Sequence, residues 1–420
     1  MTAFDLRSFA RFTWLALFGA RGTNYQLTAK RFAYLVAFYV VLALVELVTW
    51  LGFLLDDIFF PGYREVEVRQ PVFIVGNPRS GTTFLHRLMA KDEENFTCTQ
   101  LWEVLIAPSI TQRRVVQVLG ALDRRLGRSL DRLARAGRER WQEENVMHRA
   151  ALRAADEDQY LLVHAWSTLA IWLFSAILEE ARPYTYFDTE MSAAEKERIM
   201  AFYKRCVQRH LYARAGHQGQ ARHYLSKNPS ASPKVDALYE FFPDAKIIYL
   251  ARNPLDMIPS YISLLDFTWN TLGDPVEAYG ARDYVLDMAR HWYTYPLQRL
   301  EQAPEESRIV VSFDDLVRRT EETVIAIYDR FGFEMTPAFA LVLREEAERA
   351  RGHESRHEYC LEEMGLTREQ IVMDYGDVFD RFGFDTGQGE SEARGHVLAD
   401  AASPVHRAKH RLATTGLNEG

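Results

Sequence analysis

The sequence predicts an α/β protein in which helices flank a parallel β-sheet. Three short apolar segments support this prediction: Val72–Gly76, Ile247–Leu250 and Ile309–Ser312. Continuous apolar runs of this length are typical of strands that are buried on both faces of a parallel sheet. Segments with helical character separate them, and this alternation is typical of a sheet that is covered on both sides. The clearest of these helical segments are 84–90, 193–213, 234–241 and 278–299.

The composition is that of a globular protein with room for a large core. The chain has 420 residues, of which 48% are hydrophobic and 26% are charged. A net charge of −8 argues against a nucleic-acid partner, because general nucleic-acid binders are basic. The three cysteines form no CxxC pair, which excludes a zinc ribbon and fits a reducing compartment.

The N-terminal part differs from this average. Residues 33–55 are apolar except for Glu46 and Thr49, and about 20 such residues can span a bilayer. The run begins too late and is too long for a signal peptide. Residues 1–70 are therefore expected to form a membrane-associated helical segment. The alternative is a core helix that packs on the main domain.

The main domain is expected to cover residues 71–386, with a long helical insert at about 99–215. Within the insert, Arg113–Arg140 reads as a basic amphipathic helix. Its basic face is either solvated or in contact with anionic lipid or an anionic acceptor. Residues 387–420 are rich in small and polar residues and are expected to form a poorly ordered tail.

A phosphate-binding loop follows the first predicted strand. Gly76–Thr83 reads GNPRSGTT, between a strand and a helix. Loops in this position bind anions through backbone N–H groups and the positive end of the helix dipole. The glycine spacing matches a P-loop, but Thr82 replaces the lysine that contacts nucleoside triphosphates. This argues against an ordinary kinase. The residues expected to bind phosphate are Arg79, Ser80, Gly81, Thr82 and Thr83.

Two motifs of this sequence resemble those of a known family. PRSGTTFLHRLMAKD looks like the 5′-phosphosulfate loop of sulfotransferases that use 3′-phosphoadenosine-5′-phosphosulfate (PAPS). Ile247–Leu264 resembles the family's 3′-phosphate motif, whose arginine and serine would be Arg252 and Ser260. A guanidinium and a hydroxyl suit a dianionic phosphate. The resemblance covers about 71–327. It implies a bacterial-type sulfotransferase of P-loop fold, distantly similar to tyrosylprotein sulfotransferases.

The resemblance also suggests residues that act in the reaction. Lys227, in YLSKNPS, corresponds to a family lysine that contacts the sulfuryl group. Glu103, in LWE, is the first candidate for the general base, because related enzymes place a glutamate after the loop helix. His148 is the second candidate. A third is the acidic run at Asp156, Glu157 and Asp158.

The expected activity is transfer of a sulfuryl group from PAPS to a hydroxyl or amine of an acceptor, which leaves PAP and requires no metal. The alternatives are a P-loop kinase or NTPase, and an inactive nucleotide-binding protein held at the membrane. A basic insert and an apolar N-terminal segment favour a lipid-linked or amphiphilic acceptor.

The N-terminal segment also leads to an expected location. Basic residues precede the apolar run and Asp56 and Asp57 follow it, so the N-terminus is expected in the cytoplasm. A single span would then place the main domain on the opposite side from cytosolic PAPS. The domain is therefore expected to face the cytoplasm, held by a segment that lies in the membrane plane or re-enters it.

Overall fold

The computed structural model describes residues 3–125, 154–175, 177–214, 222–273, 277–351 and 360–386. The chain divides into two compact units, Met1–Tyr375 and Gly376–Gly420, which we describe separately. The second unit contributes one described helix, α18 (Gly376–Phe382). Everything else described below belongs to the first unit. The predicted tail, residues 387–420, lies outside the described residues.

The first unit is built on a five-stranded sheet in which all pairings are parallel. The strand order is β2-β3-β1-β4-β5. The strands are β1 (Val72–Gly76), β2 (Phe96–Thr97), β3 (His223–Lys227), β4 (Lys246–Ala251) and β5 (Arg308–Ser312). Because every strand runs the same way, all five carboxyl ends lie at one edge of the sheet. Ligands bind at this edge in open parallel sheets.

The predicted α/β fold is confirmed. All three apolar segments form strands, and β1 at the centre is buried along its whole length. The two-residue strand β2 was not predicted, because Phe96 and Thr97 are too few to produce a pattern. They form a strand by pairing with His223 and Tyr224 of β3.

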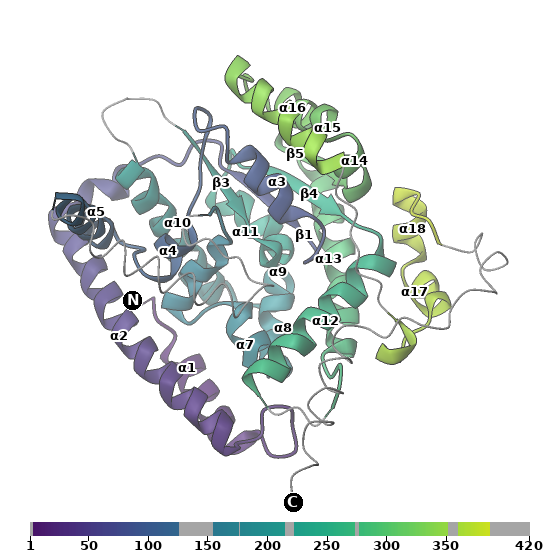
Figure 1. Ribbon diagram of the computed structural model, residues 1–420, viewed down its shortest axis with the longest axis horizontal. Coiled ribbons are helices and arrows are strands. Elements are labelled where there is room, and N and C mark those ends of the chain that lie inside the picture. The colour runs from purple at the N-terminus through teal and green to yellow at the C-terminus, as the bar shows by residue number, and fades with distance from the viewer. Residues whose placement is uncertain are drawn as a thin grey trace, which may run out of the picture. The chain divides into compact units, whose positions relative to one another are not determined.

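Helices surround the sheet and make up most of the described chain (Figure 1). The α-helices before β3 are α1 (Leu6–Trp14), α2 (Ala29–Phe59), α3 (Thr82–Met89), α4 (Leu101–Leu105), α5 (Ile110–Arg125), α7 (Leu169–Ser175), α8 (Leu178–Thr185), α9 (Phe187–Glu190) and α10 (Ala193–Arg214). Those after it are α11 (Val235–Phe241), α12 (Pro254–Leu272), α13 (Arg282–Gln302), α14 (Phe313–Arg318), α15 (Thr320–Phe331), α16 (Pro337–Arg351) and α17 (Arg368–Asp374).

Short helical turns connect these elements. They are the π-helical η1 (Leu15–Gly19) and the 3₁₀ turns η2 (Pro61–Glu65), η3 (Asp158–Ala165), η4 (Pro229–Lys234), η5 (Glu305–Ser307) and η6 (Glu362–Met364). The insert between β2 and β3 is helical in its described parts, as predicted. The predicted helix Arg113–Arg140 corresponds to α5 as far as Arg125, and its remainder lies outside the described residues.

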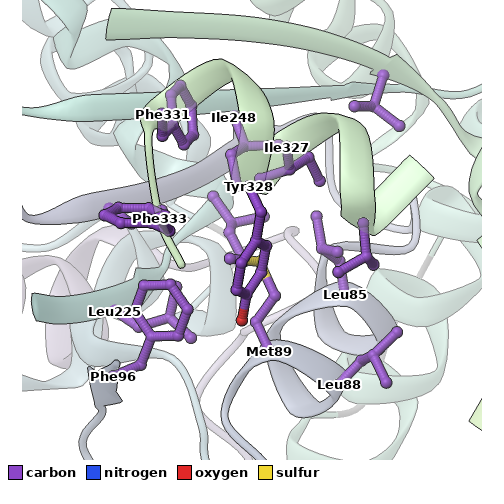
Figure 2. Packing of buried hydrophobic residues seen from close by; sticks show 14 of the residues in the cluster. Leu85, Leu88, Met89, Phe96, Leu225, Ile248, Ile327, Tyr328, Phe331 and Phe333 are labelled. Atoms are coloured by element: carbon purple, nitrogen blue, oxygen red, sulfur yellow. The ribbon is translucent and has the colours of Figure 1, made fainter. Parts of the chain in front are cut away.

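One hydrophobic cluster fixes the helix that follows the phosphate loop. Leu85, Leu88 and Met89 of α3 pack with residues of β1, β3 and β4 and with aromatic side chains from α15 and the turn after it (Figure 2). Tyr328 lies in this cluster and donates its hydroxyl hydrogen to Asp92 Oδ2 at 2.6 Å. The apolar residues of α3 recur at positions three and four apart, so one face of the helix is buried against the sheet. This packing sets where the helix N-terminus points.

The predicted N-terminal apolar helix is present as α2, and α1 packs beside it through aromatic contacts. Its length and composition would allow α2 to cross a membrane. Most of its large apolar side chains are exposed in this structure.

Candidate functional site

The phosphate loop leaves β1 at Gly76 and enters α3 at Thr82. Gly76 has φ 144°, and a Cβ atom there would lie 2.3 Å from the carbonyl oxygen of Leu250, so only glycine fits. Arg79 has φ 67°, a left-handed conformation that is uncommon for a residue with a side chain. Strain of this kind concentrates at ligand sites. The loop conformation therefore indicates a built binding site.

Several polar groups in the loop are buried without a partner. Ser80 is fully buried, and its hydroxyl has no hydrogen-bond partner among the described residues. The same holds for both side-chain amide atoms of Asn77. Buried polar groups in folded proteins are nearly always hydrogen-bonded, so unsatisfied ones need an explanation. An anion bound at the N-terminus of α3 would accept from the Ser80 hydroxyl.

The second predicted motif lies directly against this loop. Arg252 follows β4, and its Nη1 donates to the carbonyl oxygen of Arg79 at 2.9 Å. Arg79 Nε in turn donates to the hydroxyl of Ser260, on α12, at 3.0 Å. The guanidinium of Arg252 lies 4.5 Å from the ring centre of Phe313, which follows β5. The structure thus brings Arg79, Arg252 and Ser260 together, because β1 and β4 are neighbouring strands.

Lys227 ends β3 at the same edge of the sheet, paired in register with Ile74 of β1. Its side chain is 2% exposed, and its Nζ lies 2.7 Å from Glu157 Oε1. Only Glu157 among the three residues of the acidic run both contacts Lys227 and lines the neighbouring cavity.

The residues after Glu157 hold it in place. Asp158 is buried and accepts hydrogen bonds from the hydroxyls of Tyr203 at 2.5 Å and Tyr224 at 2.9 Å. Burial raises the pKa of the Asp158 carboxyl, and the hydrogen bonds from the tyrosines oppose this. Gln159 accepts from the hydroxyl of Ser230 at 2.6 Å and also bonds Glu157. The segment 157–159 is therefore held by three consecutive side chains.

The structure places the other candidate bases elsewhere. Glu103 is 2% exposed and does not line the cavity. One of its carboxylate oxygens is 2.8 Å from Arg214 and 3.7 Å from Arg113, while the other accepts from the backbone N–H of Gln100 at 2.9 Å. Asp156 accepts from the backbone N–H of Glu157. His148 lies outside the described residues.

A cavity of about 1010 Å³ joins these groups. Its polar lining comes from the phosphate loop, Arg252 and Glu157, together with Arg87 and Lys91. Its apolar lining consists of residues that no sequence motif marked in advance. They come from η3, α7 and α12 and are Tyr160, Ala170, Leu173, Tyr261, Leu264 and Leu265. The volume is at the upper end of the range for ligand pockets, which suits two molecules bound side by side.

Ligands for a metal ion are not gathered in this cavity. In the described ranges, no group of three or more His, Cys, Asp or Glu side chains is placed to hold one. The charged groups that meet at the carboxyl edge of the sheet are instead two arginines and one lysine–glutamate pair.

Comparison with known proteins gives consistent matches. Residues 71–337 match the model of the sulfotransferase family. The omega-hydroxy-beta-dihydromenaquinone-9 sulfotransferases Stf3 of Mycobacterium tuberculosis and Mycobacterium bovis are each 24% identical over 330 residues, which is 75% of this chain and 75% of theirs. The solved structure of STF9 from Mycobacterium avium has a TM-score of 0.63 and 18% identity, over 80% of this chain and 82% of its own. STF1 from Mycobacterium tuberculosis has a TM-score of 0.58 and 20% identity, over 79% and 83%.

Proposed function

Because the chain belongs to the sulfotransferase family, we propose that it transfers a sulfuryl group from PAPS to a hydroxyl or amine of an amphiphilic acceptor, which leaves PAP. One observation carries this proposal. The phosphate loop, Arg252 and Glu157 line a single cavity, and Ser260 and Lys227 lie directly behind that lining, bonded to Arg79 and Glu157.

The residues present fit a bound PAPS molecule. The 5′-phosphosulfate would accept hydrogen bonds from the unpartnered hydroxyl of Ser80, from the hydroxyls of Thr82 and Thr83, and from the N–H groups at the start of α3. The 3′-phosphate would be bound by Arg252 and Ser260. Arg79, which contacts both residues, would lie between the 3′-phosphate and the 5′-phosphosulfate. When bound, the donor supplies an activated sulfuryl group on a phosphate leaving group.

Lys227 and Glu157 are suited to opposite sides of the transfer. The Lys227 ammonium would stabilise negative charge that develops on the leaving oxygen, and burial strengthens this effect. Glu157 would accept the proton of the acceptor hydroxyl on its carboxylate, whose oxygens keep lone pairs beyond those bonded to Lys227 and Gln159. We therefore propose Glu157 as the general base. Glu103 is instead placed to hold α4 against α5 and α10.

The apolar part of the cavity lining suggests the class of acceptor. Its lining of tyrosine, leucine and alanine side chains would bind the apolar body of a molecule whose hydroxyl reaches Glu157. The curated relatives act, by their names, on a hydroxylated menaquinone derivative, so an apolar molecule with a hydroxyl group is a reasonable class here. Extracts incubated with enzyme and PAPS should contain a product heavier by one SO₃ group. A product found only among small hydrophilic metabolites would contradict this class.

We also propose that the catalytic domain faces the cytoplasm, where PAPS is made, and that α2 attaches it to the membrane. Protease added to intact cells should leave the domain uncut. Cleavage by external protease would overturn this orientation.

Binding of PAP tests the nucleotide assignment. PAP should raise the thermal unfolding temperature of the full chain, and a ligand at 100 times its dissociation constant adds about 2.7 kcal/mol to stability. ATP with Mg²⁺ is the control. A shift with ATP–Mg²⁺ and none with millimolar PAP would favour the kinase alternative. A shift with PAP but no transfer of labelled sulfate to any acceptor in an extract would favour an inactive binding protein.

Removal of Arg252 tests the 3′-phosphate position. Arg252→Ala should weaken PAP far more than adenosine-5′-phosphosulfate, which lacks a 3′-phosphate, because truncating one partner of a charge-assisted pair costs about 2–5 kcal/mol. Isothermal titration with both nucleotides measures the difference. Arg87→Ala, which removes another cavity arginine, is the control and should affect both nucleotides alike. Equal losses in Arg252→Ala would place the 3′-phosphate elsewhere.

A further inference from the structure

The helix α2 could cross a membrane, lie in its plane or simply pack on the domain, and the sequence leaves these possibilities open. The structure allows them to be separated, because it shows which face of α2 touches the protein and which does not.

One stripe of α2 is bonded to the rest of the unit along the whole helix. At its start, Lys30 Nζ and Arg31 Nη1 donate to the carbonyl oxygens of Gly273 and Leu272 at 2.8 and 3.1 Å. At its middle, Glu46 Oε1 lies 2.8 Å from Nδ1 of His164. Arg31 and Glu46 lie on the side of the helix that also buries Leu35, Thr49, Phe53 and Asp56.

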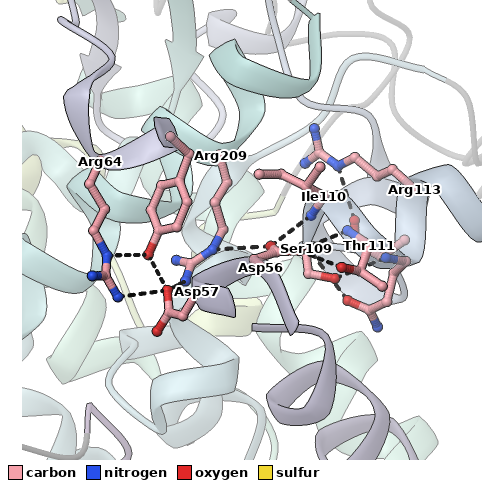
Figure 3. Close-up of polar contacts among 11 residues, drawn as sticks. Asp56, Asp57, Arg64, Ser109, Ile110, Thr111, Arg113 and Arg209 are labelled. Carbon is pink, nitrogen blue, oxygen red and sulfur yellow. Dashed lines mark hydrogen bonds and ion pairs between the residues drawn. The ribbon is translucent and has the colours of Figure 1, made fainter. Parts of the chain in front are cut away.

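The end of α2 is held most firmly (Figure 3). Asp56 is fully buried and accepts from the backbone N–H groups of Ile110 and Thr111, both at 2.8 Å, so it caps the N-terminus of α5. It also pairs with Arg209 Nε at 3.2 Å. Asp57 beside it pairs with Arg64 at 3.0 Å. The helix is thus part of the folded unit at both ends and cannot leave it as a free span.

The opposite face of α2 is apolar and uncharged. Between Phe32 and Leu55 the only acidic or basic residue is Glu46, which is paired inward. Thirteen of the 27 exposed large hydrophobic side chains in the described residues lie on α2. Five more lie on α5, which packs against α2. Four lie on α1, on η1 and in the segment that follows it: Leu6, Trp14, Phe18 and Leu27. The α5 residues are Val115, Val116, Val118, Leu119 and Leu122.

We propose that this apolar surface, formed by the N-terminal segment, α2 and α5, sits in one leaflet of a lipid bilayer with α2 parallel to the membrane plane. A helix of 31 residues is about 46 Å long, against a hydrocarbon core of about 30 Å. Because Glu46, at the middle of α2, pairs with the buried His164 of η3, a spanning orientation would carry this pair and the elements around it into the hydrocarbon core. Lying flat immerses only the outer face.

Lipid suits this surface better than a second copy of the chain. Interfaces between soluble proteins carry about one hydrogen bond per 100–200 Å², and the outer face of α2 offers few groups to make them. Basic residues flank the apolar surface, where anionic headgroups would lie. They include Arg124 and Arg125 in the last turn of α5, and Arg114, whose guanidinium stacks on the ring of Phe60 at 4.2 Å.

Vesicle flotation of the full chain tests the surface. Wild-type protein should float with phosphatidylcholine–phosphatidylglycerol vesicles, and Leu44→Glu should lower the bound fraction at least about tenfold, because it places a charge in the immersed face. The matched control is Leu341→Glu on α16, since Leu341 is 62% exposed and Leu44 is 60% exposed. Equal binding by Leu44→Glu and wild type would overturn the proposal. So would a soluble dimer that Leu44→Glu dissociates.

Depth measurements test the orientation of α2. Ala37, Leu44 and Leu51 are exposed and seven residues apart, so they lie on nearly one line of the helix. Spin labels on cysteines at these three positions, in a chain with Cys360→Ser, should report the same immersion depth. A middle label much deeper than the outer two would show that α2 crosses the bilayer and would overturn the proposal. Circular dichroism and PAP binding of each variant verify that it is folded.

Discussion

Glu157→Gln is expected to reduce the rate of sulfuryl transfer by about 10²–10⁴, the usual contribution of a positioned general base. Glutamine keeps an oxygen that can accept from Lys227, so the local fold should survive. It cannot take a proton from the acceptor. PAP affinity should change little, because the proposed base acts on the acceptor and not on the nucleotide. Single-turnover transfer of labelled sulfate, measured beside PAP titration, separates the two quantities.

Glu103→Gln is the matched control for this experiment. Glu103 lies in a buried charge cluster with Arg113 and Arg214, outside the lining of the cavity. Its substitution should lower stability while the rate per folded molecule stays within a few-fold of wild type. If instead Glu103→Gln abolishes transfer and Glu157→Gln does not, the base is Glu103 and our assignment is wrong. Loss in neither variant would direct attention to His148.

Asp56→Ala is expected to lower the free energy of unfolding by about 3–5 kcal/mol, because it removes the fully buried one of the two carboxylates that pair with the buried Arg209 and leaves only the partly exposed Asp57. It also removes the cap of α5, since the N–H groups of Ile110 and Thr111 lose their acceptor. Urea unfolding at fixed protein concentration measures the loss.

Two further substitutions serve as comparisons for Asp56→Ala. Asp56→Asn keeps an oxygen for α5 but removes the charge, so it should fall between wild type and Asp56→Ala. Asp57→Ala removes the carboxylate that pairs with Arg64 and with Nη2 of Arg209, but this side chain is 38% exposed and caps no helix, so its loss should cost less than that of Asp56. A loss from Asp56→Ala no larger than that from Asp57→Ala would mean that α2 is not fixed at this end, and would weaken the case for a helix bound to the domain.

Local sequence was sufficient for the centre of the sheet and for the phosphate loop. β1 and β4 are continuous apolar runs because both faces of a central parallel strand are buried. Gly76 and Gly81 mark the phosphate loop because its backbone has positive φ at both positions. Neighbouring strands then bring Arg252 and Ser260 to the loop. The family resemblance and the α/β fold rest on these same residues, and both are confirmed.

The pairing of Glu157 with Lys227 could not be read from the sequence, because the two residues are 70 positions apart. A carboxylate in a helical insert has the same local signature whether it meets a lysine in a cavity, as Glu157 does, or arginines in a buried cluster, as Glu103 does. The choice depends on where α10 and β3 place their basic side chains. The family resemblance therefore ranked Glu103 first as the candidate base, and the contacts favour Glu157.

The same division applies to α2. Its composition by itself predicted that a long apolar helix precedes the sulfotransferase domain, because a largely apolar run of 23 residues is far longer than a buried strand. Where a helix is apolar all round, its sequence does not tell one side of the helix from another. Only the tertiary structure decided which stripe is bonded to the domain and which faces outward, since that depends on the positions of His164, Arg209 and the carbonyl groups of Leu272 and Gly273. Apolar length is a local property of the chain, and orientation is a property of its packing.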